Sequence, residues 1–379
     1  MTRADRARAR LPRAQGGRPR LGVDAHVLDG KFQGSRTWLT EIVSRLPELV
    51  PDVDVVVYTA DPRRAATLLG GARIEHRALP HVPAIARIAA YWPYAVRRDR
   101  LDLLLTQYFA PFLQPERQIV VVHDVLFETH PEFFPPRQRL RNRALVRLSA
   151  RRSRKVVTVS EYSRREIARA YRLDPADVAV VRNGVAPAPV LGDLPPPVDP
   201  DRPVLLFVGR LEPRKNLRLA LDAFEAADVG DAQLVVVGRD DFEDPLTLSR
   251  LRATAGAVHL QDVDPGALAA LYATAAALVY PSLGEGWGIP VVEALGAGTA
   301  VLASDATAVP EAGGAACTYF DPTAHDAPEV LARLMGAAVR GELGLDEAVR
   351  SDHLAGLTWD RSAEAFAGVV RDLLGRTPG

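Results

Sequence analysis

The feature that most constrains the fold of this chain is a regular alternation of short apolar runs with helical patterns. One series of β-branched runs occupies residues 20–25, 53–59, 102–106, 119–124, 155–160 and 178–181. A second series occupies residues 204–209, 234–238, 257–261, 277–282 and 300–304. Continuous apolar strands that alternate with helices are typical of parallel sheets covered by helices on both faces. The sequence therefore predicts an α/β fold with two doubly wound, Rossmann-like sheets.

The two series are separated by residues 186–203, which contain seven prolines. Proline lacks a backbone donor and fixes φ, so such a segment cannot continue through a helix or a sheet. We therefore predict an N-terminal domain at 20–190, a proline-rich linker at 191–203 and a second domain at 204–358. A length of 379 residues agrees with two domains. Ligands of doubly wound sheets bind beyond the carboxyl ends of the strands, so residues that directly follow strands are the candidates.

Composition excludes several classes of protein. The 47 basic residues balance the 47 acidic ones, which argues against a general affinity for nucleic acid. The single cysteine, Cys317, excludes an intrachain disulfide, so the reducing cytoplasm is the expected compartment. Residues 1–19 are rich in arginine and have no apolar centre, so we expect a disordered basic tail and no secretory signal. No apolar run reaches the roughly 18 residues that a membrane-spanning helix needs.

The first strand of the second half leads into candidate phosphate-binding residues. Arg210 directly follows Gly209, and Lys215 lies just before the start of a helix. A helix N-terminus attracts phosphate, a guanidinium can bind it through two hydrogen bonds, and an ammonium adds a compact charge. A solvated basic loop is the alternative interpretation. The chain has neither a lysine-containing P-loop nor a GxGxxG motif after this strand, so phosphate is not held in either of those ways.

A glycine-rich loop of sequence LGEGWG joins a predicted strand to a predicted helix further along the second half. Gly284, Gly286 and Gly288 allow backbone N–H groups to approach a ligand closely. Glu285 adds a carboxylate, which only accepts hydrogen bonds, and Glu293 in the next helix adds a second. Amide donors beside a carboxylate suit a ligand that carries both phosphate oxygens and hydroxyls. The alternative is a tight turn with an acid that faces solvent.

The first half offers fewer candidates. His123 and Asp124 lie at the end of a strand, where a histidine can exchange hydrogen bonds with a ligand near neutral pH, although a buried structural histidine is equally compatible. Asn183 follows the last strand of this half and is also a plain turn signal. Residues 137–155 contain nine basic residues and no acid. Such a helix could contact acidic lipid through Leu140 and its neighbours, and a solvated basic helix is the alternative.

These motifs together resemble a known family. The segments FVGRLEPRKN, YPSLGEGWGIPVVEALGAG and VPEAGG are similar to the donor half of the retaining GT-B glycosyltransferases of family four, the group 1 glycosyltransferases. Glu285 and Glu293, with seven residues between them, match the paired glutamates of that family. The segments VVVHDVLFETHPEFF, VVTVSEYSRREI and VVRNGV in the first half also resemble it. The resemblance extends from about residue 20 to the C-terminus.

The resemblance implies two Rossmann-like domains that face each other across a cleft, with a nucleotide-sugar donor between them. Arg210 and Lys215 would bind the diphosphate, while Glu285 would hold the sugar and Glu293 the ribose hydroxyls. His123 would reach the sugar or the reacting centre. The remaining donor contacts would come from Gly34, Asn183, Gly209, Val263, Gly286, Trp287 and Gly288. The family does not depend on a bound metal, and its last helix, here at 359–379, crosses back to the first domain.

The expected activity is transfer of a hexose from GDP-mannose or a UDP-hexose to a hydroxyl of a glycan, a lipid-linked sugar or a small natural product, with retention of configuration. Such enzymes serve polysaccharide or glycoconjugate biosynthesis, and peripheral contact with the inner face of an acidic membrane stays open. Alternatives are a nucleotide-sugar epimerase or hydrolase on the same fold and a non-catalytic sugar-nucleotide-binding partner. The chain departs from the family in two places. Its first loop has only Gly34 where paired glycines are common, and Trp287 replaces the commoner phenylalanine.

Overall fold

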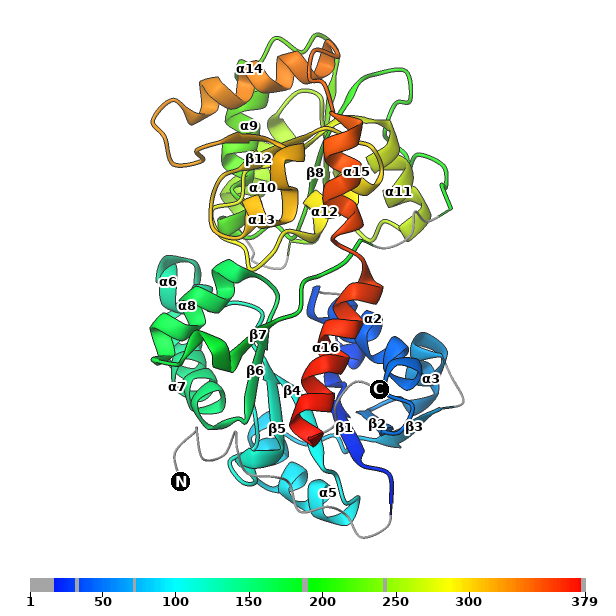
Figure 1. Ribbon diagram of the computed structural model, residues 1–379. Helices are drawn as coiled ribbons and strands as arrows, with labels where there is room; N and C mark the ends of the chain where they lie inside the picture. Colours follow the sequence, from blue (N-terminus) through cyan, green and yellow to red (C-terminus); the bar gives the residue numbers. More distant parts are fainter. Residues whose placement is uncertain (1–16, 31–33, 71–72, 186–189, 241–243, 376–379) are drawn as a thin grey trace. The chain divides into compact units, whose positions relative to one another are not determined.

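The computed structural model describes residues 17–30, 34–70, 73–185, 190–240 and 244–375. The predicted basic tail therefore lies, as far as residue 16, outside the described residues. The chain divides into two compact units, which are drawn in Figure 1. Unit 1 contains Met1–Asn183 and Trp359–Gly379, and unit 2 contains Gly184–Thr358. Among the described residues, no helix combines the length and the apolar character needed to cross a membrane.

Unit 1 is built on a seven-stranded, all-parallel sheet of order β3-β2-β1-β4-β5-β6-β7. Its strands are β1 (Arg20–Asp24), β2 (Asp54–Thr59), β3 (Ile74–Ala78), β4 (Leu103–Gln107), β5 (Gln118–Val121), β6 (Lys155–Thr158) and β7 (Val178–Val180). Its α-helices are α2 (Gly34–Leu49), α3 (Pro62–Leu69), α4 (Ala84–Ala86), α5 (Trp92–Arg98), α6 (Leu126–Thr129), α7 (Pro136–Arg152), α8 (Glu161–Tyr171) and α16 (Trp359–Leu374). The strand order reverses between β1 and β4, as in a doubly wound fold.

Unit 2 is built on a six-stranded parallel sheet of order β10-β9-β8-β11-β12-β13. Its strands are β8 (Val204–Val208), β9 (Gln233–Val237), β10 (Ala257–Leu260), β11 (Ala275–Tyr280), β12 (Val301–Ser304) and β13 (Thr318–Phe320). Its α-helices are α9 (Leu217–Ala226), α10 (Pro245–Ala253), α11 (Pro265–Thr274), α12 (Ile289–Gly296), α13 (Val309–Gly313), α14 (Ala327–Val339) and α15 (Glu347–Ala355). Here the order reverses between β8 and β11. The two sheets confirm the predicted fold class.

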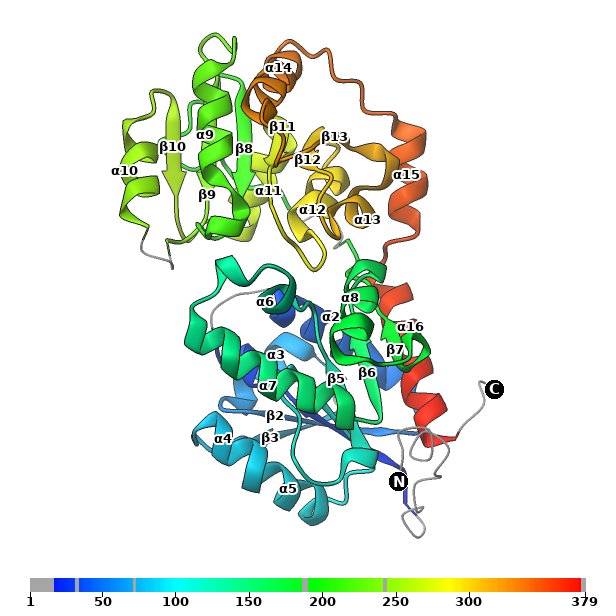
Figure 2. The same cartoon turned by 90° about the vertical axis from the view of Figure 1, so that its left-hand side faces the viewer.

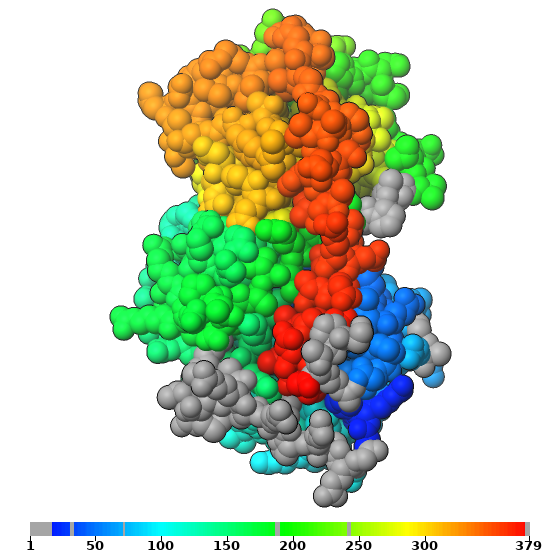
Figure 3. Space-filling model, in the orientation of Figure 1, coloured from blue at the N-terminus to red at the C-terminus, as the bar shows by residue number. Residues whose placement is uncertain are grey.

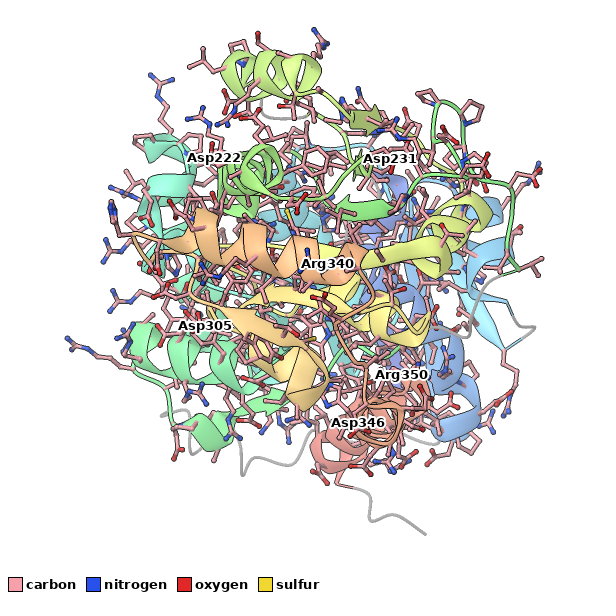
Figure 4. All side chains as sticks on the ribbon, turned by 90° about the horizontal axis from the view of Figure 1, so that it is seen from above. Asp222, Asp231, Asp305, Arg340, Asp346 and Arg350 are labelled. Carbon is pink, nitrogen blue, oxygen red and sulfur yellow. The ribbon has the colours of Figure 1, made fainter. Side chains whose placement is uncertain are left out.

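The apolar strands are buried because both faces of each sheet are covered. In β8, Leu205 and Phe207 point into a core shared with α9 and α14, while the alternate residue Leu206 is equally buried on the other face. Figure 4 shows α14, which packs against α9 and ends beside Arg340. Two strands lack the apolar run from which the other strands could be predicted. These are β3 and β13, each at the edge of its sheet, where one side needs no apolar partner.

The boundary between the units differs from the predicted one. The sequence placed it at residue 190, whereas the structure places it between Asn183 and Gly184. The reason is that the backbone of Val185 donates to the carbonyl of Leu357 over 2.7 Å and forms a bridge with Thr358, so the chain joins unit 2 before the prolines. The proline-rich segment also packs on unit 2, where the Gly192 N–H donates to Gly266.

The C-terminal helix belongs to unit 1 although it follows unit 2 in the sequence. It packs against α2, and the rings of Phe366 and Trp38 lie 5.7 Å apart, edge to face. Asp360 at its start accepts a hydrogen bond from Arg45 at 2.7 Å. Figure 3 shows this helix as the red segment on the surface of unit 1, beside the blue segment that contains α2.

Candidate functional site

The site in unit 2 is built from the two loops that follow β8 and β11. These strands are neighbours at the point where the strand order reverses, so their carboxyl ends open the crevice in which doubly wound sheets bind ligands. The first loop carries Arg210, Arg214 and Lys215, and the second carries Glu285. The backbone N–H of Leu283 donates to the carbonyl of Arg214 over 2.7 Å, which holds the two loops together.

Lys215 and Glu285 form a buried ion pair at the centre of this site. The Lys215 Nζ lies 2.6 Å from Glu285 Oε1 and also donates to the Tyr280 hydroxyl over 3.0 Å. The Arg214 Nη1 lies 2.8 Å from the other carboxylate oxygen, Glu285 Oε2. Burial alone would raise the pKa of Glu285, but the charges of Arg214 and Lys215 outweigh burial and lower that pKa to about 2. Glu285 is therefore a carboxylate at neutral pH.

Arg210 joins the same cluster through Glu212. The Arg210 Nη2 lies 2.9 Å from one oxygen of Glu212, and Arg214 Nε donates to the other oxygen over 2.6 Å. The cluster then contains three cations and two carboxylates, so its formal charge is 3 − 2 = +1. Arg210 is partly exposed, whereas Lys215 is buried. Such a cluster has net positive charge to offer to an anion.

The backbone of the two loops requires glycine at a few positions. Gly209 adopts φ +156°, and a Cβ on the neighbouring Gly238 would overlap the Gly209 carbonyl oxygen. Gly288 adopts φ +134° as the residue before α12, so a side chain there would be strained. Only Gly288, among the three glycines of the LGEGWG loop, has such a conformation in the described chain. The Glu285 N–H donates to Thr307 Oγ1 over 2.9 Å, which fixes the loop beside its glutamate.

Glu293 lies on α12 and has a different partner from Glu285. The Tyr272 hydroxyl donates to Glu293 Oε2 over 2.9 Å. Burial raises the pKa of Glu293 to about 7, against the smaller opposing effect of that hydrogen bond. The end of α12 is held by α15, because Arg350 donates to the carbonyl of Leu295 over 2.6 Å. Figure 4 labels Arg350 and Asp346, the N-cap residue of α15. The two glutamates of the sequence motif therefore sit in opposite electrostatic environments.

In unit 1, His123 is brought together with the start of α2. Its Nε2 lies 2.8 Å from Gln107 Oε1, while Gln107 Nε2 donates to the carbonyl of Ser35 over 3.4 Å. Because the amide nitrogen of Gln107 is used for Ser35, His123 carries its proton on Nε2 and keeps Nδ1 as an acceptor. Burial lowers the pKa of His123 to about 4, so the ring is neutral at pH 7. Gly34, the first residue of α2, is next to Ser35.

The other predicted donor-site residues lie in three different loops of the two units. Trp287 is buried in the second loop, and its indole N–H has no hydrogen-bond partner among the described residues. Asn183 is buried at the end of unit 1, with its side-chain oxygen unpartnered in the described part of the chain. Val263 is half-buried in the loop between β10 and α11. Gly286 lies in the second loop beside Glu285.

Sequence reasoning missed residues of the site in unit 2 and a residue at the carboxyl edge of the unit 1 sheet. It did not single out Arg214, Glu212 or Tyr280, although Arg214 precedes Lys215 in one short 3-10 turn and its proximity was a usable signal. It also did not single out Asp24, the last residue of β1 and therefore at the strand-order reversal of unit 1.

Asp24 is buried and collects several donors. His26 Nδ1 lies 2.8 Å from its Oδ1, and the indole N–H of Trp92 donates to its Oδ2 over 3.1 Å. Arg87 Nε lies 3.6 Å from Oδ2. Burial would raise the pKa of Asp24, but the hydrogen bond and charge of His26 and the charge of Arg87 hold it below its usual value. A half-exposed His26 is thereby oriented at the carboxyl edge of the unit 1 sheet.

Comparison with known proteins places this geometry in a family. The model of glycosyl transferases group 1 matches residues 195–332, and the model of glycosyltransferase family 4 matches residues 32–188. Both models describe glycosyltransferases, and together they match most of the chain, one in each half. The paired-glutamate loop and the basic loop of unit 2 both fall within the first of these matches, and His123 falls within the second.

Two curated relatives that the chain resembles are bacterial mannosyltransferases. The chain is 31% identical to O-antigen chain mannosyltransferase B of Escherichia coli over 56% of its own length, and 29% identical to O-antigen chain mannosyltransferase RfbU of Salmonella typhimurium over 59%. These alignments cover 59% and 62% of the two relatives, so the chain spans about three fifths of their lengths.

Solved structures show the same fold. HepE from Anabaena, in complex with UDP and glucose, superimposes with a TM-score of 0.69 at 17% identity, covering 93% of this chain and 99% of that one. Sucrose-phosphate synthase from Thermosynechococcus elongatus superimposes with a TM-score of 0.69 at 16% identity, covering 94% and 100%. Two doubly wound parallel sheets in one chain are the GT-B architecture that the sequence predicts.

Proposed function

We propose that this chain is a glycosyltransferase that moves a hexose from a nucleoside diphosphate sugar to a hydroxyl acceptor with retention of configuration. The observation that carries the proposal is the ionised Glu285 held between Arg214 and Lys215 at the strand-order reversal of unit 2. GDP-mannose or a UDP-hexose is the donor that we favour, because the two curated relatives are mannosyltransferases and a similar structure contains UDP and glucose. The acceptor is a glycan, a lipid-linked sugar or a small natural product.

In this proposal the basic loop of unit 2 binds the donor diphosphate. Arg210 is the partly exposed guanidinium of the cluster and Lys215 its buried ammonium. A diphosphate leaves with extra negative charge when the bond to the sugar breaks, and fixed cations stabilise charge at the position where it develops. Because the cluster already carries net positive charge, it needs little rearrangement to receive that charge. We propose that these side chains, rather than a bound metal, stabilise the leaving group.

Glu285 and its loop would hold the hexose. An ionised carboxylate only accepts hydrogen bonds, and the hydroxyls of a sugar donate them. Arg214 and Lys215 keep Glu285 ionised, and Lys215 would also face the diphosphate, so one cluster can contact both the sugar and the diphosphate of the donor. Gly286, Trp287 and Gly288 would supply backbone N–H groups. Glu293 would accept from the ribose hydroxyls of the nucleotide, and Tyr272 orients its carboxyl group.

Retention is compatible with these residues without a covalent intermediate. In a front-face reaction the bond between the sugar C1 and the donor phosphate oxygen breaks, the acceptor oxygen bonds to C1 on the same face, and the acceptor proton passes to the departing phosphate. His123 is neutral with Nδ1 unprotonated, so it would accept a hydrogen bond from a sugar hydroxyl without adding positive charge. His26, oriented by Asp24, offers a further group on the same edge of unit 1 for an acceptor hydroxyl.

The first experiment is thermal unfolding of the purified protein with GDP, UDP, ADP and dTDP. A nucleotide at about 100 times its Kd adds about 2.7 kcal/mol to the unfolding free energy of the unit that binds it. We expect one base to shift the unfolding temperature selectively, and the doubly substituted variant Arg210→Ala/Lys215→Ala to lose that shift. Arg252→Ala on α10, an exposed arginine outside the cluster, is the matched control and should keep it. No shift with any nucleotide would refute the diphosphate site.

The second experiment follows donor consumption with and without hydroxyl acceptors, using sugars attached to the nucleotide that binds. Release of nucleoside diphosphate that depends on an acceptor is the expected result. Donor consumption at the same rate without an acceptor would favour a hydrolase, and a changed sugar configuration would favour an epimerase. Selective nucleotide binding with no turnover of any donor would favour a non-catalytic binding partner.

A further inference from the structure

Helix α7 (Pro136–Arg152) carries an unusual concentration of positive charge. It contains seven arginines and no acidic residue, in a chain whose overall basic and acidic residues balance. The helix is anchored to unit 1 by a narrow buried side formed by Val146, Ser149 and Ala150. The rest of its circumference is exposed or half-buried. The sequence alone left open whether this is a solvated basic helix or a binding surface.

The outward side of α7 mixes arginine with leucine. Leu140 and Arg141 follow Arg137 by three and four residues, Leu148 follows Arg141 by seven, and Arg151 follows Leu148 by three. These five residues therefore lie on one side of the helix, opposite the buried residues. Leu140 is 69% exposed and Leu148 is 39% exposed. Arg137, Arg141 and Arg151 make no ion pair with any residue that the structure describes, so none of the described acids of unit 1 is paired with this side. Such a side combines uncompensated charge with accessible apolar groups.

Helix α5 of unit 1 extends the surface that the outward side of α7 forms. Val56 and Leu104 are both in register with Gly22 and therefore point to the same face of the sheet. Thr106, two residues beyond Leu104, is in register with Val120, so Val120 points to this face too. Val56 and Leu104 pack in the core beneath α5, and Val120 packs in the core beneath α7. The two helices therefore cover neighbouring parts of one face of unit 1, as can be followed in Figure 2.

The part of this face around α5 has the same chemistry. Ile85 and Tyr94 are each 57% exposed, and the guanidinium of Arg98 lies 5.3 Å from the centre of the Tyr94 ring. Arg97 is exposed on the same helix. We call the outward side chains of α4, α5 and α7 the basic–apolar face: Ile85, Tyr94, Arg97, Arg137, Leu140, Arg141, Leu148 and Arg151.

We propose that the basic–apolar face docks unit 1 onto the surface of an anionic lipid bilayer. Arginines near a leaflet that contains anionic lipid are attracted to its negative surface potential. Exposed leucine, isoleucine and tyrosine side chains insert at the boundary between headgroups and acyl chains, where helices with a basic side and an apolar component lie flat. An acidic protein or polymer would satisfy the arginines, but it gives no reason for the exposed apolar groups among them. The inference is independent of the proposed activity.

The test is co-sedimentation of the full-length protein with vesicles of phosphatidylcholine alone and with vesicles that also contain phosphatidylglycerol. We expect binding to the anionic vesicles only, weakened as salt rises because the attraction is screened. Each arginine near the surface contributes about fivefold to the partition coefficient, so Arg137→Gln/Arg141→Gln/Arg151→Gln should lower it about 100-fold. The matched control is Arg63→Gln/Arg64→Gln/Arg252→Gln, which removes the same charge from α3 and α10 and should change it little.

A second variant separates lipid insertion from charge attraction. Leu140→Ser/Leu148→Ser keeps every charge and should lower the partition coefficient at least about tenfold, because two exposed leucines lose their apolar burial in the membrane. Circular dichroism and the nucleotide-induced shift in unfolding temperature should stay those of the wild type in all variants. Equal binding by the triple arginine variant and the control would overturn the proposal. So would an unchanged partition for the leucine variant, or retention on immobilised polyglutamate without vesicle binding, which would indicate an acidic polymer as the partner.

Discussion

Replacing Glu285 by glutamine removes the negative charge that lies between the buried Lys215 and the half-buried Arg214. Lys215 Nζ and Arg214 Nη1 lie 2.6 and 2.8 Å from the carboxylate oxygens of the wild type. The variant keeps the size of the side chain but presents these two cations with a neutral amide. Lys215 and Glu285 are each 7% exposed, so water can do little to compensate. We expect a large loss of stability in unit 2, together with loss of the proposed sugar contact.

The size of the effect follows from the pKa of Glu285. Its folded-state pKa of about 2, against an ordinary 4.5, corresponds to about 3 kcal/mol of preference for the charged form. Burial lowers the pKa of Lys215 by more than the charge of Glu285 raises it, and the charge of Arg214 lowers it further, so burial offsets the gain of the pair on the lysine side. The figure is therefore the cost of removing the carboxylate charge and not the net contribution of the ion pair to folding, which is smaller.

The pH dependence has a defined sign. A depressed carboxyl pKa contributes stability above the unfolded-state pKa, and this contribution is lost as the pH falls through the folded-state pKa. For Glu285 the contribution should fall from about 3 kcal/mol at pH 7 to about 1 kcal/mol near pH 3. The difference in unfolding free energy between wild type and Glu285→Gln should shrink in the same way.

Urea unfolding at several pH values measures this difference. Trp287 is the single tryptophan of unit 2, two residues from Glu285, so fluorescence can be compared with circular dichroism to identify the transition of this unit. Glu293→Gln is the matched control, because Glu293 is a buried glutamate of the same unit whose pKa is raised to about 7. Wild type loses stability from Glu293 as the pH rises from about 4.5 through 7, so this variant should gain relative to wild type over that range.

Two results would refute the reasoning. The first is a change in unfolding free energy below about 0.5 kcal/mol for Glu285→Gln at pH 7, which is the range of ordinary surface substitutions. The second is a large change that stays constant from pH 7 to pH 3, since this would attribute the loss to packing and not to charge.

Three further predictions concern the same loops and the opposite unit. Gly238→Ala should destabilise unit 2 by about 1–3 kcal/mol in urea unfolding, because the new methyl group overlaps the Gly209 carbonyl; equal stability would show that the loop yields freely. His123 should titrate near pH 4 with its proton on Nε2 in nitrogen-detected NMR of histidine-labelled protein, and a midpoint between 6 and 7 would contradict its burial. Treatment with EDTA should leave the nucleotide-induced shift in unfolding temperature intact because fixed cations face the diphosphate, whereas a shift restored only by a divalent cation would argue for a metal-bridged donor.

Much of the fold could be predicted from local patterns in the sequence. The apolar runs of β5 and β8 are continuous because both of their faces are buried, so their strand character is visible without a structure. The edge strands β3 and β13 could not be found in the same way, because an edge position relaxes the need for apolar residues. The unit boundary at Asn183 was also hidden, since it depends on a backbone hydrogen bond between Val185 and Leu357, which are far apart in the chain.

The sequence by itself determined the kinds of chemical group at the site and the strands that they follow. Arg210, Lys215 and Glu285 each lie just beyond a predicted strand, and a parallel sheet brings such positions to one edge. Only the tertiary structure decided how these groups share charge. In the folded chain Arg214 pairs with Glu285 across the two loops and helps to keep that carboxyl group ionised. Burial raises the pKa of Glu293 to about 7, although the two glutamates belong to one motif. The physical reason is that a pKa depends on burial and on charges within a few ångströms, and those distances are set by residues remote in sequence.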